Sequence, residues 1–303
     1  MDLLRLFAAN LLPIFLIAAV GAVVAATLRL DARPLSLVTF HVFSPALVFT
    51  LIVHSTLDGA EVARMAGFAT VAMGVPGLLA LAYARAARLT RERTAALLLV
   101  VMFANAGNFG LSLVSLAFGP AALAHAAIYF ATMVALTFTA GVVVASLGRA
   151  DARTALAGVL RVPTVYAVVL ALLMKAAGAV LPGPVDRSVG LLADAAIPAM
   201  LVVLGMQLHR NGRLRPEPGL APALAFRLLA GPAAAVAVAP VFGLDGPARQ
   251  AGIVQSAVPT AVVTTVLADA YGLEPSFVTQ AVMVSTLLSP LTLTPLLAWL
   301  GAA

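Results

Sequence analysis

Long apolar segments alternate with short polar ones along almost the whole chain of 303 residues. Ten apolar segments can be marked, each close to the ~20 residues that a helix needs to cross the hydrocarbon core of a bilayer. They cover residues 3–28, 35–54, 65–84, 94–118, 122–147, 155–180, 187–208, 219–242, 248–270 and 276–300. Because the segments are continuously apolar rather than alternating, the pattern predicts transmembrane helices and not a β-barrel.

The polar segments between these spans carry turn and charge signals. DARP at 31–34, LPGPVDR at 181–187 and GLDGPAR at 243–249 combine proline or glycine with charge. The first apolar run extends from Leu6 to Leu28, longer than the ~7–15-residue core of a signal peptide. We therefore interpret this run as a retained membrane helix, and we expect no soluble domain between the spans.

Composition supports a membrane solvent. The chain is 62% hydrophobic and 10% charged, with a mean hydropathy of +1.08, whereas soluble domains are about half apolar and about a quarter charged. The net charge of +6 comes from arginines in short loops, which is a topology signal rather than a sign of nucleic-acid binding. The sequence holds no cysteine, which excludes disulfides and thiolate metal sites.

Lysine and arginine fall unevenly on alternate loops. One set of loops holds thirteen of these residues and the other set five. Positive residues are retained on the cytoplasmic side, so both termini are predicted to lie outside.

Two prolines indicate an internal repeat. Pro45 in SPALVF and Pro198 in IPAMLV are 153 residues apart (198 − 45). The same shift places residues 103–110 (FANAGNFG) on residues 256–263 (SAVPTAVV). The chain therefore divides into two halves of five spans, residues 1–150 and 151–303. Five is odd, so the second half enters the membrane inverted, an architecture of secondary transporters.

Spans 4 and 9 are interrupted at equivalent positions near mid-span. Glycine costs about 1 kcal/mol in a helix interior and proline about 3 kcal/mol. Two broken helices that cross at this depth would direct helix N-termini, with their free N–H groups and partial positive charge, into one cavity that suits an anion. The predicted substrate-binding residues are Asn105, Gly107, Asn108, Val258, Pro259, Thr260, Ser44 and Gln255.

Other polar residues within the spans receive separate predictions. Asp194 is the only carboxylate clearly inside a span, so an ion-coupling role is expected, with a structural hydrogen bond as the alternative. For Gln207, the sequence leaves two roles open, which are contact with the substrate or an ion and interhelical hydrogen bonding. His41 and His54 are expected to have interfacial or packing roles. Arg227 is expected to snorkel from the cytoplasmic start of span 8.

Three segments resemble the auxin efflux carrier family. NAGNFG at 105–110 is similar to its Asn-x-Gly-Asn-x-Gly/Pro signature, and SAVPTAVVTTVLADAYG at 256–272 is similar to the ninth span of its bacterial members. LADAAIPAMLVVLGMQL at 192–208 resembles the seventh span. The plant auxin exporters carry asparagine before the proline of the second crossover, where this chain has Val258, which speaks against indole-3-acetate as the substrate.

The resemblance implies a carrier in the bacterial inner membrane that moves small organic anions, either auxin-like monocarboxylates or malate- and malonate-like dicarboxylates. It implies an elevator-like motion, in which spans 1, 2, 6 and 7 form a scaffold and spans 3–5 and 8–10 a mobile transport core. Substrate identity, direction of transport, coupling ion and oligomeric state, a homodimer included, are open from the sequence.

Other classes fit less well. The sequence has no Gly-x-Ser-x-Gly elbow, HExxH helix or P-loop, and no carboxylate cluster for Mg2+, so neither an enzyme nor a cofactor or metal site is predicted. A channel-like pore is a further alternative, and its flux would be far above about 10^3 per second, the upper range of ordinary turnover. A drug or metabolite exporter, or a cation-coupled symporter of another ten-helix inverted-repeat family, is the main alternative within the carriers.

Overall fold

The computed structural model describes residues 2–146, 160–210 and 214–302. Within these residues the regular structure is helical, apart from one isolated β-bridge. The predicted boundary between the two halves at residue 150, the start of span 6 and three loop arginines (Arg149, Arg153 and Arg213) lie outside the described residues. The prediction of an all-α membrane fold is confirmed.

The first described stretch ends at residue 146 and contains twelve helical elements. They are α1 (Leu3–Leu6), η1 (Phe7–Leu11), α2 (Leu12–Leu28), α3 (Arg33–Val38), η2 (Thr39–Phe43), α4 (Ser44–Val53), α5 (Gly59–Ala86), α6 (Arg91–Met102), η3 (Ala106–Leu111), α7 (Ser112–Leu136), η4 (Thr137–Gly141) and α8 (Val142–Ala145). Here η1 to η4 are π-helical turns within longer helices.

The remaining described residues add ten elements. They are α10 (Pro163–Ala176), α11 (Gly183–Asp194), α12 (Ala196–Arg210), α13 (Leu220–Ala225), η5 (Phe226–Ala230), α14 (Gly231–Val238), η6 (Ala239–Phe242), α15 (Gly246–Ala257), α16 (Val263–Tyr271) and α17 (Pro275–Trp299). Here η5 is a π-helical turn and η6 a 3-10 helix.

Seven helices within the described residues are long and apolar enough to cross a membrane. They are Leu3–Leu28, Arg33–Val53, Gly59–Ala86, Ala106–Ala145, Gly183–Arg210, Leu220–Phe242 and Pro275–Trp299. By this measure the protein is a multi-pass membrane protein.

The difference from ten predicted spans has identifiable causes. The helix Ala106–Ala145 has 40 residues, about 60 Å at 1.5 Å per residue and about twice the hydrocarbon thickness. It is kinked at Gly119 (φ 74°, ψ −164°), directly before Pro120. The predicted span 9 consists of two shorter helices, α15 and α16, and span 6 corresponds to the 14-residue α10.

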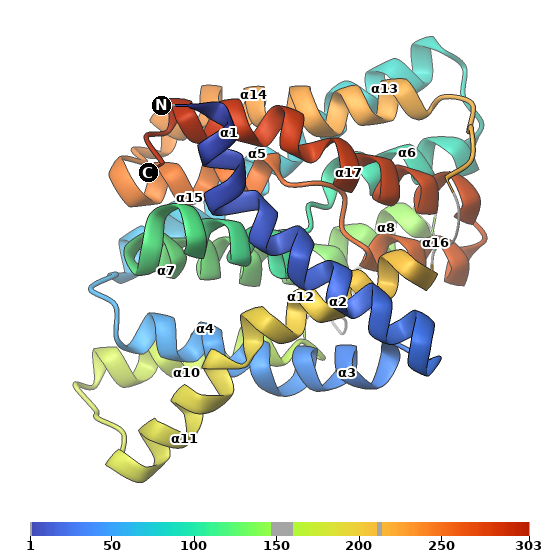
Figure 1. Cartoon of the computed structure of the whole chain (residues 1–303). Helices are drawn as coiled ribbons and strands as arrows, with labels where there is room; N and C mark the ends of the chain where they lie inside the picture. The colour runs from blue at the N-terminus through green and yellow to red at the C-terminus, as the bar shows by residue number, and fades with distance from the viewer. Residues whose placement is uncertain (1, 147–159, 211–213, 303) are drawn as a thin grey trace.

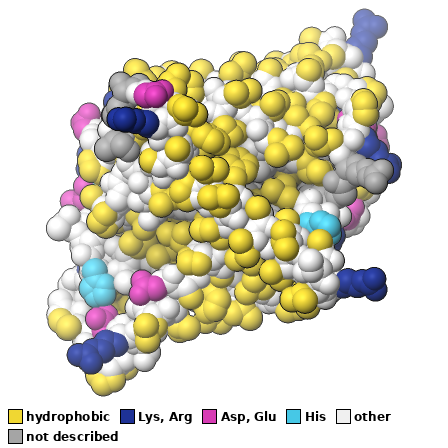
Figure 2. Space-filling view, viewed as in Figure 1, with side chains coloured by type: hydrophobic (Ala, Val, Ile, Leu, Met, Phe, Trp, Pro, Cys, Tyr) yellow, Lys and Arg dark blue, Asp and Glu magenta, His cyan; other side chains and the backbone are white. Residues whose placement is uncertain are grey.

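The outer surface matches a bilayer environment. Figure 2 shows apolar side chains over most of one face, with charged side chains gathered toward the left and right edges. Leucines and valines at helix positions such as Leu16, Leu78, Leu173 and Leu291 are more than half exposed. Such a surface is stable against lipid but not against water.

Two glycines allow α2 and α12 to pack backbone against backbone. A Cβ at Gly205 would lie 1.7 Å from the carbonyl oxygen of Ala18, and one at Gly21 would lie 2.1 Å from the carbonyl oxygen of Val202. Small residues at such crossings are characteristic of helix association in membranes. The pair α2 and α12 thus forms a tight unit beside the centre of the molecule (Figure 1).

Candidate functional site

The two predicted interruptions are present, and they meet. Figure 1 shows α6 leading leftward through its break into α7, and α15 leading rightward through its break into α16. The two unwound segments pair through an antiparallel bridge between Ala104 and Thr260. The Asn105 N–H donates to the Pro259 carbonyl at 2.8 Å, and the Ala261 N–H donates to the Phe103 carbonyl at 2.8 Å.

Each break leaves carbonyl groups without partners in its own helix, and neighbouring segments supply them. The Thr260 hydroxyl donates to the Val100 carbonyl at 3.0 Å, and the Thr260 N–H donates to the Ser285 hydroxyl at 3.2 Å. The Arg227 guanidinium donates to the carbonyls of Val101, at 2.8 Å, and Ser256. Backbone freed at membrane depth is tolerated only with such partners.

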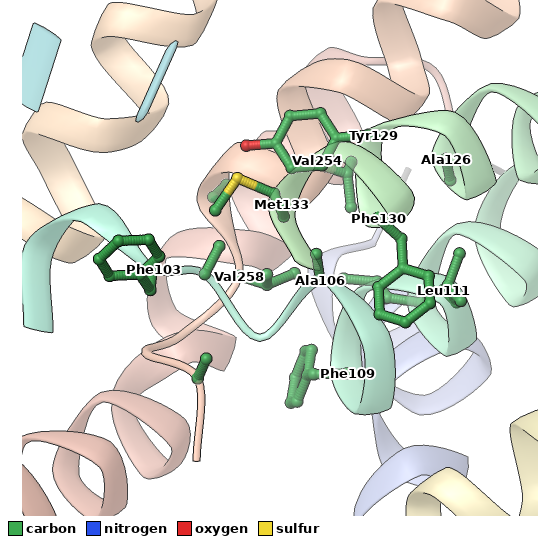
Figure 3. Packing of buried hydrophobic residues seen from close by; sticks show 14 of the residues in the cluster. Phe103, Ala106, Phe109, Leu111, Ala126, Tyr129, Phe130, Met133, Val254 and Val258 are labelled. Atoms are coloured by element: carbon green, nitrogen blue, oxygen red, sulfur yellow. The ribbon is translucent and has the colours of Figure 1, made fainter. Parts of the chain in front are cut away.

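Apolar packing surrounds the junction. Figure 3 shows Phe103, Phe109 and Val258 beside the unwound segments, with Tyr129 and Met133 on α7. All five belong to one buried cluster. This packing excludes lipid from the polar backbone of the breaks and fixes their positions.

A cavity of about 770 Å³ lies on one side of the junction. Its wall includes the residues that begin the helices after both breaks, 104–108 and 261–263. The first N–H groups of a helix have no partner within that helix and carry partial positive charge. Two such helix starts at one cavity favour a negatively charged ligand.

Some residues of the cavity wall carry a buried polar atom that has no hydrogen-bond partner. Six buried side-chain nitrogen or oxygen atoms among the described residues have no hydrogen-bond partner, and three belong to the cavity wall. These three are Asn105 Nδ2, Thr39 Oγ1 and Gln207 Oε1. A buried polar group without a partner costs about 1–3 kcal/mol, so a side-chain rotation that turns one of these atoms toward a polar ligand would be favoured.

The rest of the wall is apolar along its length and charged at its rim. Phe130, Met133, Phe138 and Met200 are among the apolar lining residues. Three arginines and two other titratable residues also line the cavity: Arg33, Arg161, Arg210, His41 and Asp269. Sequence reasoning used the arginines only as orientation signals, because their convergence depends on loops far apart in the chain.

The predicted binding residues divide into two groups. Asn105, Gly107, Asn108 and Ser44 line the cavity. The other four, Val258, Pro259, Thr260 and Gln255, are buried and do not line it.

Gln255 has a packing environment of its own. Its Nε2 donates to the Ala126 carbonyl at 3.2 Å. A Cβ at Gly110 would lie 1.9 Å from its Oε1, so the glycine makes room for the amide. Gln255 therefore packs against η3 and α7, which follow the first break.

Asp194 lies outside the cavity, at the end of α11, with an exposed side chain. Its predicted coupling role stays a prediction. His54 pairs with Asp186 at 3.2 Å near a helix end, and both side chains are about half exposed.

The prediction that Arg227 snorkels to the interface is wrong. Arg227 is 3% exposed and lies in η5, a π-helical turn. The two helix-end carbonyls described above give its guanidinium partners inside the protein, so it does not need to reach water. The sequence signal was an arginine within an apolar span, eight residues after Gly219.

These features define a multi-pass helical membrane protein with a cavity at the meeting point of two interrupted segments. Residues 148–297 match the family model described as membrane transport protein. An uncharacterized transporter of Methanothermobacter thermautotrophicus is 24% identical over 266 residues, which cover 87% of each chain. An uncharacterized transporter of Methanocaldococcus jannaschii is 25% identical over 68% of each chain.

A plant relative matches over a shorter region. Auxin efflux carrier component 3a of Oryza sativa subsp. japonica is 32% identical over 116 residues, 37% of this chain and 19% of the rice protein. The chain belongs to the auxin efflux carrier family of membrane transport proteins. This is a family of transporters and not of enzymes.

Proposed function

We propose that this chain is a secondary carrier that moves a small organic carboxylate, auxin-like or malate- and malonate-like, across the membrane. The observation that carries the proposal is the Asn105 amide. Asn105 lines a cavity together with two helix starts, and its Nδ2 is buried without a hydrogen-bond partner. An amide donor and helix-start N–H groups together suit a carboxylate.

The proposed topology has ten spans in two inverted repeats, residues 1–150 and 151–303, with spans 4 and 9 broken and crossing. The kink at Gly119 divides the 40-residue helix into two spans, which supports the count. Pro45 and Pro198 both lie within the first three residues of a helix, α4 and α12, which supports the repeat. A density map that resolves residues 147–159 tests this topology, and fewer than ten crossings would refute it.

The proposed binding site consists of the four cavity-lining residues, Asn105, Gly107, Asn108 and Ser44. Val258, Pro259, Thr260 and Gln255 support it by holding the two breaks together. Asp194 is proposed to couple transport to a cation. The site needs no cofactor and no metal, and the other partners we propose are the lipid bilayer and, as a homodimer, a second copy of the chain.

The proposed location is the bacterial inner membrane, with both termini outside. The charged rim of the cavity then faces the cytoplasm, because Arg33, Arg161 and Arg210 belong to the arginine-rich loops. The chain has no cysteine, so Asp2→Cys provides a single label site. The cysteine at position 2 should react with an impermeant maleimide in intact cells. If it reacts only after the cells are opened, the N-terminus lies inside and the proposed orientation is wrong.

Uptake of labelled carboxylates into proteoliposomes tests the function. Loss of one hydrogen bond to a charged ligand costs about 1.5–3 kcal/mol, so Asn105→Ala should weaken substrate affinity roughly 10- to 100-fold. Asn10→Ala is the matched control, because Asn10 is buried outside the cavity and donates to its own helix at Leu6. Equal transport by wild type and Asn105→Ala would remove Asn105 from the site.

The proposed motion is of the elevator type. Spans 1, 2, 6 and 7 form the scaffold, and the close packing of α2 on α12 supports its rigidity. Spans 3–5 and 8–10 form the transport core. Phe15 of the scaffold and Phe109 of the core have ring centroids 6.0 Å apart.

A short cross-linker between cysteines at positions 15 and 109 should stop transport. Cysteines at positions 55 and 175 provide the control within the scaffold, where the Lys175 ammonium donates to the Ser55 carbonyl at 2.8 Å. This second cross-link should leave flux unchanged. Full flux with the first pair cross-linked would exclude relative motion of the two groups.

A further inference from the structure

Arg227 is a buried cation with no carboxylate partner. It is 3% exposed, and none of the three ion pairs among the described residues includes it. Its Nε has no hydrogen-bond partner, so the two carbonyl contacts hold the guanidinium. An unpaired charge at membrane depth is costly and usually functional.

The two carbonyls that it contacts occupy equivalent places. Val101 is the second-last residue of α6, and Ser256 is the second-last residue of α15. Both belong to the negative ends of their helix dipoles, each equivalent to roughly half an elementary charge. Two such ends together carry about one negative charge, which balances the one positive charge of the guanidinium.

The same chemistry would otherwise suit a bound cation. In carriers with broken helices, unwound carbonyls and half-helix C-terminal ends coordinate the coupling ion, whereas the half-helix N-terminal ends face the anionic substrate group. Here the helix starts at 106 and 263 line the cavity, and the preceding helix ends at 101 and 256 bind Arg227.

We infer that Arg227 is a resident counter-cation that occupies the place of a coupling ion at the junction of the two breaks. The carrier then needs no sodium bound at this junction. Only the statement that transport needs no sodium at the junction rests on the proposed function. The binding of cations at the junction can be measured without any substrate. Arg227 acts as a positioning residue, since it holds the two helix ends and does not line the cavity.

Cation rescue of purified protein in detergent tests the inference. Arg227→Ala should lower Tm by roughly 5–10 °C through the loss of partners for two helix ends. Guanidinium at low millimolar concentration should restore part of this loss, whereas choline at equal ionic strength should not. Wild type and Arg91→Ala are the controls and should show no such rise, because Arg91 is exposed at the start of α6.

Two further variants separate charge from hydrogen bonding. Arg227→Lys keeps the charge and should have a Tm closer to wild type than Arg227→Gln, which keeps only a neutral donor. If Arg227→Gln equals Arg227→Lys, the role is structural and the inference falls. It also falls if guanidinium raises the Tm of Arg227→Ala no more than that of wild type.

Radioactive sodium binding to wild type gives a readout that does not depend on the folding of any variant. Because Arg227 already occupies the junction, we predict that wild type binds no sodium saturably there. Saturable binding, with bound sodium found against the Val101 and Ser256 carbonyls in a density map, would overturn it. Failure of carboxylate transport would refute the proposed function and leave all these results intact.

Discussion

The two interruptions resemble each other in position and differ in what their residues contact. In the first break, Asn105, Gly107 and Asn108 line the cavity. In the second, Val258, Pro259 and Thr260 are buried behind it. The first break supplies groups to a ligand, and the second supplies the framework that holds the first in place.

Residue chemistry accounts for this difference. Pro259 has no N–H group, so the chain can leave the helix there without burying an unpaired donor. The hydroxyl of Thr260 then serves a carbonyl of α6. The backbone N–H of Asn105 bonds to the Pro259 carbonyl, and its side-chain Nδ2 has no hydrogen-bond partner.

Among substitutions within the two breaks, Thr260→Val should have the largest effect on stability. The change keeps the side-chain shape and leaves the Val100 carbonyl without the hydroxyl donor, at a cost of about 1–3 kcal/mol. Thermal unfolding in detergent measures this loss. Affinity of the folded fraction for a transported carboxylate should change little.

Thr264→Val is the matched control for Thr260→Val. Thr264 is equally buried, but its hydroxyl donates at 2.7 Å to the Ala261 carbonyl, which also accepts the Thr264 N–H at 3.1 Å. The control variant should therefore lose less stability. Equal losses would show that Thr260 has no special role in joining the breaks.

Asn108→Ala should give the opposite result at a smaller magnitude. Asn108 is partly exposed to the cavity, so its loss should weaken carboxylate affinity about 3- to 10-fold. The melting temperature should stay near that of wild type. A large fall in Tm with unchanged affinity would place Asn108 in the framework with the second break.

Asp194→Asn should have the smallest effect on stability, within about 0.5 kcal/mol, because its side chain is exposed. If Asp194 couples transport to protons, carboxylate transport by this variant in proteoliposomes should no longer respond to a pH gradient. A response equal to that of wild type would assign Asp194 a structural role.

The interruptions were predictable because their residues contradict their surroundings. Asparagine, glycine and proline inside apolar runs are helix-weakening, and a common shift of 153 residues relates the two runs. The shift also indicated that the two segments belong together. Hydrogen bonds between residues 103–105 and 259–261 bear out that they meet.

Side-chain direction was less accessible from the sequence. Spacing along the chain does not state how a helix rotates after a break, so Gln255 and Val258 were expected in the site and lie behind it. Arg227 is buried within the π-helical turn η5, and no residue pattern in the sequence predicts that this turn is π-helical. The arginines of the rim, such as Arg161 and Arg210, converge only through the tertiary fold.

A density map of the reconstituted protein with a transported carboxylate bound tests the central claim most directly. We predict carboxylate density within hydrogen-bond distance of the Asn105 amide, between the helix starts at 106 and 263. Ligand density elsewhere, or continuous helices through residues 103–105 and 258–262, would contradict it.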